Sequence, residues 1–264
     1  MIDSHAHVAD ADFDSDRDDV LRRAREAGLT GIVCVGQDVA SAERAVALAR
    51  RGYPGLALVP TAGLHPHEAR RLGEERDGLA ALVARPEVVA VGETGLDFHY
   101  DRSPRDVQRE SFRWHLATAR RVGKPVVVHV REAHEEAIED VAAEGRGVDA
   151  VLHCFTGTAE LARRWLDLGA SISFSGIVTF KNAGAVREAA ALVPADRLLV
   201  ETDSPFLAPD PLRGQRCEPA FVTRTAARLA ELRGEPAARL AERTSENARR
   251  LFFRAASDAR APLS

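Results

Sequence analysis

The sequence predicts an α/β fold, a (β/α)8 barrel of the TIM type, as one domain over residues 1–264. Eight short apolar stretches alternate along the chain with stretches of helical periodicity. These stretches are continuously apolar, which is typical of parallel strands covered on both faces. The chain also has the length of such a barrel. A doubly wound open sheet is the alternative.

Each element has its own local signal. The expected strands cover residues 1–7, 31–36, 56–63, 88–92, 126–130, 150–153, 170–173 and 198–201. The expected helices cover residues 14–27, 41–51, 104–122, 133–144, 158–168 and 182–192, and several stop at a glycine such as Gly28 or Gly123. Pro66 is expected to open a helix after the third strand. Residues 218–232 and 236–253 predict two closing helices, and residues 255–264 are expected to fray.

Polar residues follow five of the expected strands and favour the barrel over the open sheet. His5 and His7 are two residues apart, so both would project from one face of the first strand. The others come at later strand ends: Glu93, His129, His153 and Asp203. In a barrel these ends meet at one mouth, whereas in an open sheet the first and eighth strands would be distant.

Four imidazoles and two carboxylates can hold two divalent metal ions. Glu93 is central in the chain and is the expected bridge, and Asp203 is expected to bind one ion and accept a proton from water. Taken singly, Glu93 could be a buried ion pair, and each histidine could be satisfied by local hydrogen bonds. Glu201 is expected deeper in the barrel, supporting the site.

Charge indicates the class of substrate. A net charge of −4 argues against a strongly basic surface that coats nucleic acid. Two divalent ions with two carboxylates leave about +2, which suits a phosphodiester and metal-activated hydrolysis; carboxylic esters and lactones remain possible. His65 is expected to line the mouth. Arg213 and Arg216 could grip a phosphate or be solvated loop charges, and Tyr100 could stack on a base or pack over the mouth.

Three widely spaced cysteines and the lack of a signal peptide favour a cytoplasmic location. No membrane association and no obligate protein partner are expected. Cys154 lies beside His153, but its interpretation as a small buried hydrophobic residue is favoured over a role as a metal ligand. No apolar run reaches 18 residues, so no membrane span is expected.

Seven motifs resemble those of the TatD family of metal-dependent hydrolases and deoxyribonucleases. They are DSHAH (3–7), GLHPH (63–67), GETGLD (92–97), PVVVHVR (125–131), HCFTG (153–157), FSGIVTFK (174–181) and ETDSPFLAP (201–209). The stretch 172–180 resembles the YcfH-like branch. Departures from the usual residues fall at Thr94, His115 and Cys217 and leave every expected ligand in place.

The resemblance implies a barrel of the amidohydrolase type with two metals. One would be held by His5, His7, Glu93 and Asp203, and the other by Glu93, His129 and His153. It also implies Arg131 as a substrate contact. Family members are described as Mg-stimulated 3′–5′ exonucleases on DNA, and some relatives as D-aminoacyl-tRNA deacylases. Imidazole ligands suit Zn, Mn, Co or Ni better than Mg.

Three functions are therefore weighed. The first is a two-metal phosphodiesterase acting on single-stranded DNA or 3′ ends. The second is a hydrolase of carboxylic esters such as D-aminoacyl-tRNA. The third is a metal-dependent scaffold with no enzymatic activity.

Overall fold

The computed structural model describes residues 1–253, so the expectation for residues 255–264 lies outside the described residues. Eight parallel strands form one sheet in the order β1 to β8. They are β1 (Ile2–Ala6), β2 (Gly31–Cys34), β3 (Ala57–Ala62), β4 (Ala90–Asp97), β5 (Val126–Arg131), β6 (Ala150–Leu152), β7 (Ser171–Phe174) and β8 (Leu198–Val200).

Hydrogen bonds between the first and last strands close the sheet. The backbone N–H of His7 donates to the carbonyl of Ser204 at 2.8 Å, and that of Asp203 donates to the carbonyl of His5 at 3.0 Å. The Ser4 hydroxyl also donates to the carbonyl of Val200. The barrel is therefore confirmed, and the open sheet is excluded because its first and last strands would not meet.

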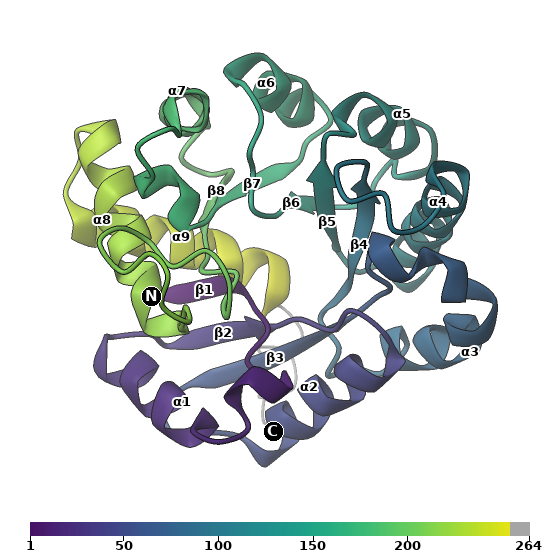
Figure 1. Cartoon of the computed structure of the whole chain (residues 1–264), viewed down its shortest axis with the longest axis horizontal. Coiled ribbons are helices and arrows are strands. Elements are labelled where there is room, and N and C mark those ends of the chain that lie inside the picture. Colours follow the sequence, from purple (N-terminus) through teal and green to yellow (C-terminus); the bar gives the residue numbers. More distant parts are fainter. Residues whose placement is uncertain (254–264) are drawn as a thin grey trace, which may run out of the picture.

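Helices form an outer ring around the strands (Figure 1). They are α1 (Arg17–Glu26), α2 (Val39–Arg51), α3 (Leu72–Val83), α4 (Arg105–Val122), α5 (His134–Glu144), α6 (Ala159–Asp167), α7 (Gly184–Leu192), α8 (Val222–Arg233) and α9 (Ala237–Phe252). Short 3₁₀ helices η1 (Ala11–Phe13), η2 (Pro66–Arg71), η3 (Gly176–Thr179) and η4 (Pro219–Phe221) lie in the connections.

Each of two expected helices begins with a short 3₁₀ helix. Pro66 opens η2, and α3 follows it; likewise η4 precedes α8 where one helix was expected. Proline fixes φ at a value that the 3₁₀ and α helix share, so it marks where a helix begins without selecting its type. Within residues 1–253, every helix is too short or too polar to cross a membrane.

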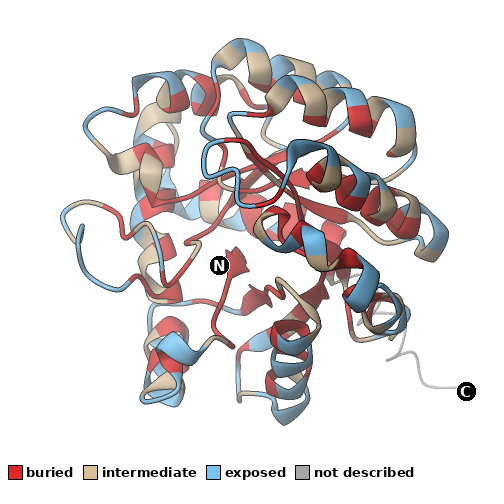
Figure 2. Ribbon diagram, turned by 45° about the vertical axis from the view of Figure 1, so that its right-hand side comes forward, coloured by how far each residue is buried: buried red, intermediate tan, exposed pale blue. Residues whose placement is uncertain are grey.

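Apolar side chains form two layers. The larger lies between the strands and the outer helices, so that the helices show buried inner faces and exposed outer faces (Figure 2). The smaller fills the barrel interior with one side chain from most strands, including Val33, Val127 and Val151. Leu251 and Phe252 of α9 pack against this inner layer. Helix α9 therefore closes one end of the barrel.

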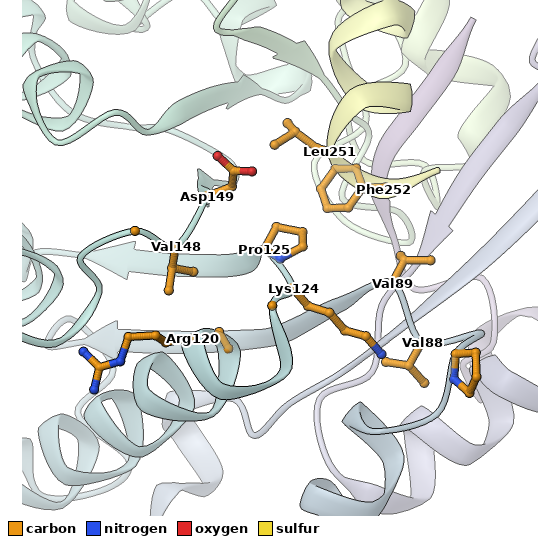
Figure 3. A pocket seen from close by; sticks show the side chains of 13 residues that line it. Val88, Val89, Arg120, Lys124, Pro125, Val148, Asp149, Leu251 and Phe252 are labelled. Carbon is orange, nitrogen blue, oxygen red and sulfur yellow. The ribbon is translucent and has the colours of Figure 1, made fainter. Parts of the chain in front are cut away.

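A cavity of about 210 Å³ lies at that closed end (Figure 3). Its walls include Val88, Pro125 and Val148, which all precede strands, together with Leu251 and Phe252. Because parallel strands point the same way, residues before strands and residues after strands lie at opposite ends of a barrel. The polar residues that follow the strands are therefore at the other end, the mouth.

Candidate metal centre

The six expected ligands lie together at the mouth. Their donor atoms fall into overlapping groups in which all members lie within 4.8 Å of one another. The groups are His5–Glu93–His153, His5–His7–Asp203 and His65–Glu93–His129. The structure thus brings all six together and adds His65.

The first set of donor atoms surrounds one point. Nε2 of His5 and Nε2 of His7 are 3.3 Å apart. Oε2 of Glu93 lies 3.5 and 3.7 Å from them, and Oδ1 of Asp203 lies 3.6 and 3.4 Å from them. Four ligands at about 2.1 Å from a central ion are about 3.4 Å apart in a tetrahedron. The five distances, which leave out the Glu93–Asp203 pair, are close to that value.

The second set uses the other oxygen of Glu93. Oε1 of Glu93 lies 3.1 Å from Nδ1 of His129 and 2.9 Å from Nε2 of His153. The two ring nitrogens are 3.1 Å apart. The carboxylate of Glu93 therefore presents one oxygen to each set, as a bridging ligand does.

Strand β4 places this bridge. The strand expected from the sequence ended before Glu93, whereas β4 continues to Asp97 with a register shift between Val91 and Thr94. Apolar content marked only its first half, because the second half is buried in spite of being polar. Gly92 (φ 131°) and Gly95 (φ 142°) permit this path, since a Cβ would lie 2.5 Å and 2.0 Å from carbonyl oxygens of β5.

Burial and charge act against each other in the cluster. Burial opposes ionisation of Glu93, but the imidazole of His153 beside it holds its pKa well below the ordinary value. Burial also opposes ionisation of Asp203, and His7 and His5 lower its pKa. Both carboxylates are therefore anions at neutral pH, the form that binds cations.

Asp97 is a supporting residue that the sequence analysis did not single out. It is 1% exposed, and its Oδ2 lies 2.8 Å from Nε2 of His67 and 3.4 Å from Nε2 of His129. A carboxylate at Nε2 favours the tautomer of His129 whose Nδ1 lone pair faces Glu93. The only sequence signal was its position at the end of the GETGLD motif.

Two other buried residues support the cluster through hydrogen bonds. Glu201 is fully buried; its Oε1 accepts the N–H of Cys154 at 2.7 Å and lies 3.4 Å from Nδ1 of His153. This agrees with the supporting position expected for it. His115 accepts the N–H of Leu64 at Nε2, and burial lowers its pKa to about 4. The neutral ring fixes the backbone next to His65.

His65 is neutral and carries its proton on the inward nitrogen. Its Nδ1 accepts the N–H of His67, so the proton of the neutral ring is on Nε2, 3.5 Å from Oε1 of Glu93. Burial, together with His129 and His67, holds its pKa well below the ordinary value. Its Nε2 is therefore a hydrogen-bond donor rather than a metal ligand.

The three arginines differ in their surroundings. Arg131 ends β5, with its guanidinium 4.7 Å from the ring centre of Tyr100. Arg213 stacks at 4.0 Å on Phe180. Arg216 instead turns to the β1–α1 loop, where it donates to Asp16 at 2.6 Å. Its charge is thus used to join two loops, unlike the charges of the other two.

The donor set fits divalent cations. Imidazole nitrogens and carboxylate oxygens converge from five strands in a largely buried cluster. A buried set of this kind is costly without a compensating cation.

The sequence model of the family described as "TatD related DNase" matches residues 2–253. The uncharacterized metal-dependent hydrolase YcfH of Escherichia coli K12 is 42% identical over 247 residues, covering 89% of this chain and 88% of that protein. The 3′-5′ ssDNA/RNA exonuclease TatD of Pantoea vagans is 40% identical over 246 residues, covering 90% and 93%. The crystal structure of YjjV, a TatD homologue from E. coli K12, superposes with a TM-score of 0.85 at 31% identity, covering 96% and 98%.

Proposed function

Because the chain belongs to the TatD family of metal-dependent hydrolases, we propose that it is a 3′–5′ exonuclease that hydrolyses phosphodiester bonds of DNA, with a single strand or a 3′ end as substrate. The observation that carries the proposal is the division of the two Glu93 oxygens between two donor sets. A cytoplasmic location, which the three unpaired cysteines favour, belongs to the same proposal.

Two divalent ions are part of this proposal. His5, His7, Asp203 and Oε2 of Glu93 would hold one, and His129, His153 and Oε1 of Glu93 the other. Bound there, the ions supply Lewis-acid chemistry: they polarise the phosphoryl group and make water nucleophilic at neutral pH.

The protein groups have separate roles. Asp203 is ionised, and its side chain is 13% exposed, so it can accept the proton of the attacking water. His65 can donate its Nε2 proton as a hydrogen bond to a phosphate oxygen. Arg131 and Arg213 add positive charge at the rim of the mouth, which favours a phosphate over a neutral ester.

The test uses metal-loaded protein and single-stranded DNA labelled at the 5′ or the 3′ end. Wild type should release nucleotides from the 3′ end, and Asp203→Asn and Glu93→Gln should each lower kcat/KM by about 10²-fold to 10³-fold, the cost of losing one group that stabilises the transition state. The matched control is Asp140→Asn, which changes a buried carboxylate on α5, outside the mouth.

Two outcomes would count against the proposal. One is release of nucleotides no faster than by Asp203→Asn. The other is Asp203-dependent hydrolysis of D-aminoacyl-tRNA in a parallel assay with no cleavage of DNA, which would identify a carboxylic-ester hydrolase instead. Metal content by mass spectrometry of the native protein should fall from two ions per chain in Glu93→Gln.

A further inference from the structure

Two large apolar side chains are exposed among residues 1–253, and both are at the mouth. Tyr100 is 52% exposed and Phe206 is 54% exposed. Exposed apolar residues are ordinary when scattered over a surface, but here they gather at one functional end.

The two rings face the metal centre from opposite sides. Tyr100 follows β4, and Phe206 follows β8; in a closed ring of eight strands these are four steps apart and therefore diametrically opposed. The ring of Phe206 lies 6.1 Å from that of His7, in the first donor set. The ring of Tyr100 lies 5.5 Å from that of His67, which lies 6.5 Å from that of His129 in the second set.

Backbone hydrogen bonds hold both aromatic residues in place. Oδ1 of Asp97 accepts the N–H of Tyr100 at 2.9 Å and that of His99 at 3.0 Å. The N–H of Phe206 donates to the carbonyl of Asp203 at 2.9 Å. The backbone of each aromatic residue is thus fixed by a nearby aspartate, so little backbone order would have to be gained on binding.

Positive charge accompanies both rings. The guanidinium groups of Arg131 and Arg102 lie 4.7 and 5.5 Å from the centre of the Tyr100 ring. Beyond Phe206, the loops after β6, β7 and β8 enclose a cavity of about 620 Å³ whose walls include Lys181 and Arg213, with one carboxylate, Asp210. Within residues 1–253 these four cations form no ion pair, in contrast to Arg216 with Asp16.

We propose that Tyr100 and Phe206 are two base-stacking platforms that bracket the scissile phosphate of a single-stranded nucleic acid. The strand leaves Phe206 through the cavity with Lys181 and Arg213, and its terminal nucleotide stacks on Tyr100. This inference rests on the proposed function and adds the two residues that would select an unpaired strand: bases must be free to stack on them, so paired ends are excluded.

The experiment compares two oligonucleotides of equal length, one natural and one without bases at its last two positions. Tyr100→Ala and Phe206→Ala should each raise KM for the natural strand by about fivefold to 100-fold, the range measured for loss of one base–aromatic stack. Their kcat should change much less, and neither variant should differ from wild type on the strand that lacks the bases. Tyr100→Phe and Phe206→Tyr should restore KM.

The matched control is Tyr53→Ala. Tyr53 also carries a guanidinium, that of Arg25 at 5.9 Å, but it precedes β3 and so lies at the closed end. The KM of the Tyr53→Ala variant should equal that of wild type. A second arm removes charge: Lys181→Ala should weaken binding of a twelve-nucleotide strand and reduce its salt dependence, with no effect on a dinucleotide.

The outcomes are distinct. If wild type cleaves neither oligonucleotide, the proposed function fails. If wild type cleaves both, and the alanine variants leave KM for the natural strand unchanged or impair both strands equally, the stacking platforms are wrong. A duplex with blunt ends cleaved as fast as the single strand would also overturn the inference.

Discussion

The two ends of the barrel are made from the same strands but carry different chemistry. On β5, Val127 belongs to the apolar inner layer, and His129, two residues later on the same face, belongs to the metal centre. Val151 on β6 and His153, the residue directly after that strand, repeat this arrangement. A step of about 6.6 Å along a strand therefore separates a layer that stabilises the fold from a layer that can react.

The cations at the two ends differ in the same way. At the closed end, Lys124 donates to the carbonyls of Val83 and Arg85 at 2.6 and 2.7 Å, so its charge is used within the fold. At the mouth, Arg131 and Arg213 lie on aromatic rings. The comparison indicates that substitutions at one end should change stability and those at the other end should change binding.

The largest effect is expected at the closed end. Phe252→Ala should lower the free energy of unfolding by about 3–5 kcal/mol, because it removes a buried ring and leaves a cavity in the inner layer. Under conditions where the variant is folded, kcat/KM should be that of wild type. Denaturant unfolding and an activity assay on the same samples measure the two quantities.

Phe252→Leu is the control, since it keeps most of the apolar volume and should cost less. A folded Phe252→Ala protein that lost activity in proportion to its stability would show that the two ends are coupled and would break the comparison.

The fold could be predicted from the sequence because parallel strands buried on both faces are apolar throughout. The ends of several helices are also marked by glycine. Strand β4 is the exception: its second half, with Glu93 and Asp97, is buried yet polar, so hydrophobicity alone ended it early. The position of Glu93 just after an apolar run located it, but the continuation of the strand depends on its pairing with β5, which composition does not determine.

The ligands could be predicted because they recur at one place, the carboxyl ends of strands. Asp97, His67 and His115 could not be, since their roles arise from contacts between connections far apart in the chain. Arg213 and Arg216 show which kind of information the sequence alone does not supply. They share one loop, and the position of Asp16, two hundred residues away, gives them different environments.

A pH titration sharpens the description of the mouth. Burial opposes protonation of His153, but Glu93 raises its pKa well above the ordinary value. In the same way Asp97 raises the pKa of His129, and Asp203 raises that of His7. In the metal-free protein these rings therefore hold protons that an unfolded chain would release, and a metal ion must displace them.

The apparent metal affinity should then rise with pH, by about 100-fold between about pH 6 and about pH 8 if one proton is displaced per ion. The sign for stability is opposite: raised imidazole pKa values stabilise the metal-free fold at low pH, and that contribution is lost as pH rises through them. Chelator competition and thermal unfolding of the metal-free protein measure the two trends. An affinity independent of pH would contradict the assigned protonation.

The smallest effect is expected from Asp97→Asn. The amide keeps an oxygen for the N–H groups of His99 and Tyr100, so the turn after β4 should persist and the free energy of unfolding should change little. It removes the anion beside Nε2 of His67 and His129, and with it the preference for the tautomer whose Nδ1 faces Glu93. Loss of such an outer carboxylate weakens metal binding by about 10–100-fold.

The control is Asp140→Asn, at a buried carboxylate between Arg109 and Arg113. It should do the reverse, lowering stability and leaving metal affinity unchanged. If both variants lost stability and neither lost metal, Asp97 would belong with the residues that stabilise the fold, and the separation between the two ends of the barrel would not hold at β4.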